Sequence, residues 1–126
     1  MEGSPNLYVI AGGIYNLGFA IFHLFFWRLF HWREDLASLT HINRSVMQIL
    51  NLCLTFVFLL FAYLSLFHST ELVAGGLGST LLLGNALFWF LRMAQQMVFF
   101  GIRNRISAAF TVLFFLGGLV YLLPLM

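Results

Sequence analysis

The sequence predicts an all-α integral membrane protein whose four transmembrane helices form an antiparallel up-down bundle. Hydrophobic residues make up 62% of the 126 residues and charged residues only 8%, whereas a soluble domain carries roughly 25% charged residues. The mean hydropathy is +0.97. Four apolar runs also reach the length of about 20 residues that a membrane-spanning helix needs. This composition excludes disorder, nucleic-acid recognition and a soluble enzyme fold.

Each apolar run is expected to form one helix of a single domain, residues 1–126. The expected spans are residues 7–30, 45–67, 72–91 and 106–125, and an extension of the third to residue 100 is left open. Backbone polar groups in lipid must be hydrogen-bonded internally, and the alternation typical of barrel strands is absent, so the spans are predicted to be helices. The connections are short, which makes neighbouring helices antiparallel.

The arginines predict the orientation in the membrane. Arg33 and Arg44 belong to the first connection, and Arg103 and Arg105 to the third, whereas the termini and the second connection contain no Arg or Lys. Basic residues favour the cytoplasmic side of a membrane. The segments 31–44 and 101–105 are therefore expected in the cytoplasm and both termini outside.

The chain carries a weak internal repeat. The sequence Ala-Gly-Gly at residues 11–13 recurs at residues 74–76, and Asn-Arg at residues 43–44 recurs at residues 104–105. Such matches are expected from a parallel duplication of a two-helix hairpin, as in some transporters. Chance matching between apolar segments is the alternative.

Polar residues inside the spans predict a candidate ligand site. His23 lies on the first span, Gln48 and Asn51 share a stripe on the second, and Arg92 and Gln96 share one on the third. The stripes lie at similar depth, which favours a polar cavity that opens to the cytoplasm. Two alternatives stay open: interhelical hydrogen bonds worth roughly 0.6 kcal/mol each, and an Arg92 side chain that reaches the lipid headgroups.

Small residues on the third span predict a packing surface. Gly76, Thr80 and Gly84 are spaced by four and are expected on one helix face. Small residues of this kind let two helices approach closely in a membrane.

Several chemistries have no support in the sequence. No Asp or Glu lies inside a span, and His23 lacks a second histidine at its depth, so a haem at His23 is not expected. No metal site and no cofactor are predicted. Catalytic residues are not identified, and the sequence leans against an enzyme.

Three functions remain. The first is an accessory or assembly subunit that contacts other membrane proteins through its helices. The second is a small-molecule or lipid binder, or a transporter, that uses the polar cavity. The third and weakest is a membrane redox or haem-binding subunit. The expected partners are the lipid bilayer and either copies of the chain, in a homo-oligomer, or a larger membrane complex; nucleic acid is not among them.

Overall fold

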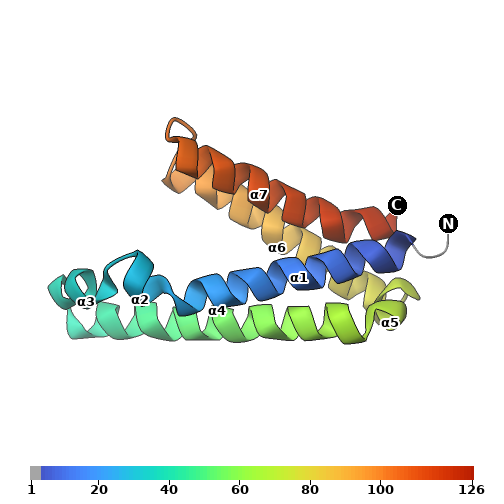
Figure 1. The fold of residues 1–126 in the computed structure, drawn as a ribbon, viewed down its shortest axis with the longest axis horizontal. Coiled ribbons are helices and arrows are strands. Elements are labelled where there is room, and N and C mark those ends of the chain that lie inside the picture. Colours follow the sequence, from blue (N-terminus) through green and yellow to red (C-terminus); the bar gives the residue numbers. More distant parts are fainter. Residues whose placement is uncertain (1–3) are drawn as a thin grey trace.

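The structure, a computed structural model, describes residues 4–126, and all of its regular elements are helices (Figure 1). Helices account for 88% of the chain, and the described residues contain no strand. Four helices of residues 4–126 are long and apolar enough to span a membrane. The predicted all-α class with four such helices is therefore confirmed. They are α1 (Ser4–Leu24), α4 (His41–Phe67), α6 (Leu77–Phe99) and α7 (Arg105–Leu122).

Local side-chain chemistry sets several helix ends. The Thr40 hydroxyl accepts a hydrogen bond from Asn43 N over 3.3 Å and caps α4, and Asn104 Oδ1 accepts one from Ile106 N over 2.7 Å and caps α7. Both residue types are favoured at this position because their oxygens satisfy a free backbone N–H. At its other end α7 continues into the 3₁₀ turn η2 (Leu123–Leu125).

The first connection begins earlier than the hydropathy predicts, because α1 ends at Leu24 and not near residue 30. It contains the short helices α2 (Phe26–Leu29) and α3 (Trp32–Asp35) and the 3₁₀ turn η1 (Leu36–Ser38). Aromatic contacts hold this segment against α1. The Phe26 ring stacks on His23 at 4.1 Å and meets Trp32 edge-on at 5.5 Å.

A pair of glycines separates α5 (Ser69–Val73) from α6. Gly75 and Gly76 have φ values of 105° and 59°, a region that side chains with a Cβ rarely adopt. The third long helix therefore starts at Leu77 and not at residue 72. The matching Ala-Gly-Gly segment at residues 11–13 is instead continuous helix within α1, so the two segments of the repeat differ in conformation.

The long helices pack as two pairs, with α1 against α4 and α6 against α7. We call these the first and the second hairpin. In Figure 1 the hairpins meet at the end that holds α5 and the C-terminus, the terminal end, and diverge toward the end that holds α3 and the turn between α6 and α7, the loop end.

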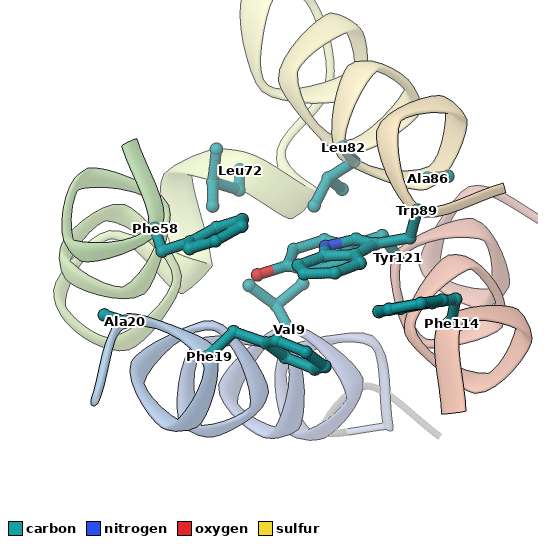
Figure 2. Close-up of a cluster of buried hydrophobic side chains, with 10 residues drawn as sticks. All are labelled: Val9, Phe19, Ala20, Phe58, Leu72, Leu82, Ala86, Trp89, Phe114 and Tyr121. Atoms are coloured by element: carbon teal, nitrogen blue, oxygen red, sulfur yellow. The ribbon is translucent and has the colours of Figure 1, made fainter. Parts of the chain in front are cut away.

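Side chains from both hairpins meet at the terminal end. The Tyr121 hydroxyl of α7 lies 2.7 Å from Asn16 Nδ2 of α1 and 2.7 Å from Ser65 Oγ of α4. From the residue just before Asn16 on α1, the Tyr15 hydroxyl donates to the Leu113 carbonyl over 2.9 Å. Figure 2 shows the buried apolar side chains that converge beside these contacts from α1, α4, α5, α6 and α7.

Glycines allow close helix contacts in the structure, but not at the face of Gly76, Thr80 and Gly84 that the sequence predicts. A Cβ at Gly12 would lie 2.5 Å from the Tyr121 ring, and one at Gly117 would lie 2.5 Å from the Tyr15 ring. The predicted face of Gly76, Thr80 and Gly84 is exposed, and no atom lies within 4 Å of a Cβ built on Gly84. Within residues 4–126 this face forms no close contact, and it stays a prediction for contact with another chain.

Candidate functional site

The divergence of the hairpins leaves a cavity of about 650 Å³ between them. Rings from all four long helices form most of its wall, and its polar part consists of His23, Arg92, Gln95, Gln96, Asn104 and Ser107, of which Arg92 lies one turn from Trp89 on α6. The lining residues are Phe19, Phe22, His23, Phe26, Phe30, Leu54, Phe58, Phe88, Trp89, Leu91, Arg92, Gln95, Gln96, Phe100, Asn104, Ile106, Ser107, Phe110 and Phe114. The cavity is therefore apolar and aromatic over most of its wall, with a smaller polar part.

Trp89 forms the base of the cavity. Its ring projects from α6 into the space between the helices, as Figure 2 shows, and is fully buried. It stacks on Phe58 of the first hairpin at 5.3 Å and on Phe114 of the second at 5.8 Å. Aromatic pairs at such distances contribute about 0.5–1.5 kcal/mol beyond the burial of their area. The rings thus close the cavity toward the terminal end.

Arg92 is the charged residue of the polar part. Its Nη2 donates to Gln96 Oε1 over 3.1 Å, and the guanidinium lies 4.5 Å from the centre of the Phe114 ring. Gln96 Nε2 in turn donates to Ser107 Oγ over 2.9 Å, and that hydroxyl donates to the Gly101 carbonyl. Gln96 and Ser107 are buried. This chain of hydrogen bonds holds the guanidinium at the cavity wall.

His23 meets the cavity from the first hairpin and is oriented by Asn51. Asn51 Nδ2 donates to the His23 carbonyl over 3.1 Å, which leaves its Oδ1 facing His23 Nδ1 at 2.7 Å. Since an amide oxygen only accepts, Nδ1 must carry the proton. In the neutral ring Nε2 is then an unprotonated acceptor. Among residues 4–126 it has no hydrogen-bond partner.

The structure places the residues of the predicted polar cavity in two groups. His23, Arg92 and Gln96 line the cavity, and Asn51 touches it only through His23. Gln48 does not line it, because its Nε2 donates to the Arg44 carbonyl of its own helix over 3.2 Å. The physical reason is that α4 packs along α1, where Asn51 meets His23, and reaches α6 through rings such as Phe58 on Trp89.

The sequence-based prediction of the cavity did not include the residues that α7 contributes. Ser107, Phe110 and Phe114 all line the cavity, and their spacing of three and four puts them on one helix face. That spacing was a usable signal. It is weak in a helix that is apolar on all sides, because many triplets of residues share it.

A smaller depression of about 230 Å³ lies on the side of the cavity between α1 and α7. It shares Phe19, Phe22 and Phe110 with the cavity and is completed by Gly18 and Leu113. No atom lies within 4 Å of a Cβ built on Gly18. The cavity wall is thus thin toward the lipid at this position.

The lining carries a positive charge without a negative one. No Asp or Glu is among the lining residues, and within residues 4–126 Arg92 takes part in no ion pair. The described residues also contain no group of three or more His, Cys, Asp and Glu side chains that could hold a metal ion. The arrangement suits recognition of a ligand by hydrogen bonding, charge and ring contacts.

Together these features define a small all-helical chain with four helices long and apolar enough to span a membrane and an amphipathic cavity between two hairpins. No protein-family model, curated protein or solved structure matches it. Its function is therefore argued from the cavity.

Proposed function

We propose that the protein binds a small amphiphilic molecule of the membrane in the cavity between its hairpins. The observation that carries this proposal is the combination, in one cavity wall, of rings around Trp89 with the polar side chains of His23, Arg92 and Gln96. Small-ligand sites usually enclose about 300–1,000 Å³ and combine an apolar lining with a few placed polar groups. The volume of about 650 Å³ lies within that range.

We further propose that the chain sits in the bilayer as an up-down bundle with its loop end in the cytoplasm. This end holds four arginines: Arg33 in α3, Arg44 in the first turn of α4, Arg103 in the turn after α6 and Arg105 at the start of α7. Positive residues flanking membrane spans favour the cytoplasmic side. On this orientation the polar part of the cavity is accessible from the cytoplasm. A rocking of one hairpin against the other, as expected of a duplicated hairpin, would make the binder a transporter.

Native mass spectrometry of two matched variants tests the binding proposal. Leu91 lines the cavity and is 60% exposed, whereas Leu87, one turn away on α6, is 58% exposed and does not line it. Leu91→Trp should fill part of the cavity and release a ligand retained from the membrane, and Leu87→Trp should not. Equal retention of the same ligand by both variants would contradict the proposal.

An accessory role through contacts with other membrane proteins is the second proposed function. It is favoured by the end of α6, where Val98 and Phe99 are 78% and 79% exposed, and by the open face of Gly84. An accessory subunit should assemble with its partner as well with Leu91→Trp as in the wild type, and should fail to assemble with Gly84→Leu. A binder that acts alone or as a homo-oligomer should lose its ligand with Leu91→Trp and keep it with Gly84→Leu.

We propose no cofactor for either function. The aromatic lining and the free Nε2 of His23 are the features that a haem would need, but residues 4–126 place no second histidine in the lining. The purified protein is expected to show no Soret absorbance. A Soret band that disappears in His23→Ala would contradict the binding proposal and favour a redox subunit.

A further inference from the structure

The Arg92 guanidinium has more hydrogen-bond donors than there are acceptors around it. A guanidinium has five N–H donors and no acceptor. Among residues 4–126 the Arg92 side chain makes one hydrogen bond, to Gln96 Oε1, and one ring contact, to Phe114. The Gln96 amide is already engaged on its other side with Ser107. The remaining donors are therefore free for a ligand.

The position of Arg92 makes an acceptor necessary. Arg92 lies nearly two turns before the end of α6 at Phe99, about 10 Å along the axis at 1.5 Å rise per residue. The next arginines in the chain, Arg103 and Arg105, are exposed and lie beyond that end. Arg92 is half-buried, and even partial burial of an ionised side chain is costly unless the charge is paired. A negative group in the cavity would compensate the charge.

We propose that the natural occupant is a single-chain carboxylic acid, with its carboxylate on Arg92 and its apolar chain against the rings above Trp89. This inference rests on the proposed binding function. Charge complementarity selects an anion, since Arg92 is the lining residue with a permanent charge. One cation matches one negative charge, which favours a carboxylate over a phosphate monoester, whose charge is about −1.5 to −2. The flat guanidinium fork also fits a carboxylate with two parallel hydrogen bonds.

The size and surroundings of the cavity specify the rest of the ligand. About 650 Å³ holds one hydrocarbon chain with its head group, whereas a two-chain phospholipid needs more room. The depression between α1 and α7, at Gly18 and Phe22, adjoins the cavity and is where the proposal has an apolar chain enter from the bilayer.

Brominated amphiphiles with identical chains test the head group. The full chain, in a neutral maltoside detergent, is titrated with 11-bromoundecanoate, 11-bromoundecanol, 11-bromoundecyl phosphate and 11-bromoundecyl-trimethylammonium. Bromine quenches nearby tryptophan fluorescence, and the signal of Trp89 is the difference between the wild type and Trp89→Phe. Each titration is repeated with Arg92→Gln, Arg92→Lys and, as a matched loss of charge outside the cavity, Arg103→Gln.

The carboxylate should bind the wild type at least tenfold more tightly than the alcohol. Arg92→Gln should weaken carboxylate binding roughly 10- to 100-fold, the range expected for hydrogen bonds to charged groups, and should leave alcohol binding unchanged. Arg92→Lys should restore part of the loss, and Arg103→Gln should have no effect. The comparison of head groups in the wild type needs no Arg92 variant, so a misfolded Arg92→Gln does not remove the test.

The other outcomes separate the two proposals. Equal binding of alcohol and carboxylate overturns the acid and leaves the binding function intact. Tighter binding of the phosphate or the ammonium overturns the choice of a carboxylate. An equal loss in Arg103→Gln shows a general surface-charge effect and overturns the role of Arg92. If no probe quenches Trp89, the cavity does not take single-chain amphiphiles and the proposed function fails as well.

Discussion

The Tyr121 hydroxyl accepts a hydrogen bond from the Asn16 side-chain amide over 2.7 Å, and this contact ties α7 to α1 at the terminal end. Asn16 is fully buried, and its Oδ1 has no partner among residues 4–126. Ser65 joins the same hydroxyl from α4. The two hairpins are thus joined through one oxygen at the end where they converge, and the cavity opens away from it.

Tyr121→Phe should therefore destabilise the protein by about 1–2 kcal/mol, because Asn16 and Ser65 lose their shared partner while they stay buried. The measurement is unfolding in a series of detergent mixtures, followed by circular dichroism. Tyr63→Phe is the matched control, since Tyr63 is 53% exposed and makes no side-chain hydrogen bond within residues 4–126. A loss of stability in the control as large as in Tyr121→Phe would contradict the role given to the buried hydroxyl.

Two glycines of α6 should respond oppositely to alanine. A Cβ at Gly78 would run into the carbonyl oxygens of Leu72 and Glu71, which are backbone atoms and cannot move aside cheaply. Gly78→Ala should cost roughly 1–3 kcal/mol through overpacking. Gly84→Ala meets no atom within 4 Å and should gain up to about 1 kcal/mol from helix propensity. The same unfolding assay compares them, and equal effects would show that the turn between α5 and α6 is not as tight as the structure has it.

Hydropathy was sufficient to predict the four long helices, because twenty apolar residues in lipid have few alternatives to a helix. It could not predict how the Ala-Gly-Gly segments behave. In α1 the pair Gly12-Gly13 stays helical and packs against Tyr121 and Leu66. Gly75 and Gly76 instead have positive φ values and interrupt the helix between α5 and α6. The difference lies in the neighbouring helix, which a local sequence does not encode.

The candidate site was predictable only in part for a related reason. Helical spacing gives the residues that share a face, and it grouped Gln48 with Asn51 and Arg92 with Gln96. It does not say which neighbour that face meets. Because α4 lies against α1, Asn51 orients His23 from within the first hairpin, while Arg92 and Gln96 reach the cavity from the second.

Cysteine labelling should place the loop end in the cytoplasm and α5 outside. The native Cys53 is exposed, so the experiment starts from Cys53→Ala. An impermeant thiol reagent applied from outside should modify Thr70→Cys and should not modify Ser38→Cys or Ile102→Cys until the membrane is opened. All three positions are exposed in the structure, so burial does not account for a missing reaction. Labelling of positions 38 and 102 alone from outside would reverse the orientation.

The last prediction concerns the proton on His23. The Asn51 side-chain nitrogen donates to the backbone carbonyl of His23, so the amide oxygen faces the ring. That oxygen accepts from Nδ1 and keeps the proton on this nitrogen. Nitrogen NMR of protein labelled at its histidines should show, for the neutral ring, a protonated Nδ1 and an unprotonated Nε2. Asn51→Leu removes the acceptor and should shift the proton to Nε2, the nitrogen that free histidine side chains favour. Gln48→Leu is the matched control, because Gln48 lies one turn away and bonds only to its own helix. If Asn51→Leu leaves the tautomer unchanged, Asn51 does not orient the ring. If it shifts as predicted, Asn51 sets the tautomer, and the unprotonated Nε2 of His23 is the acceptor that the first hairpin offers to the cavity.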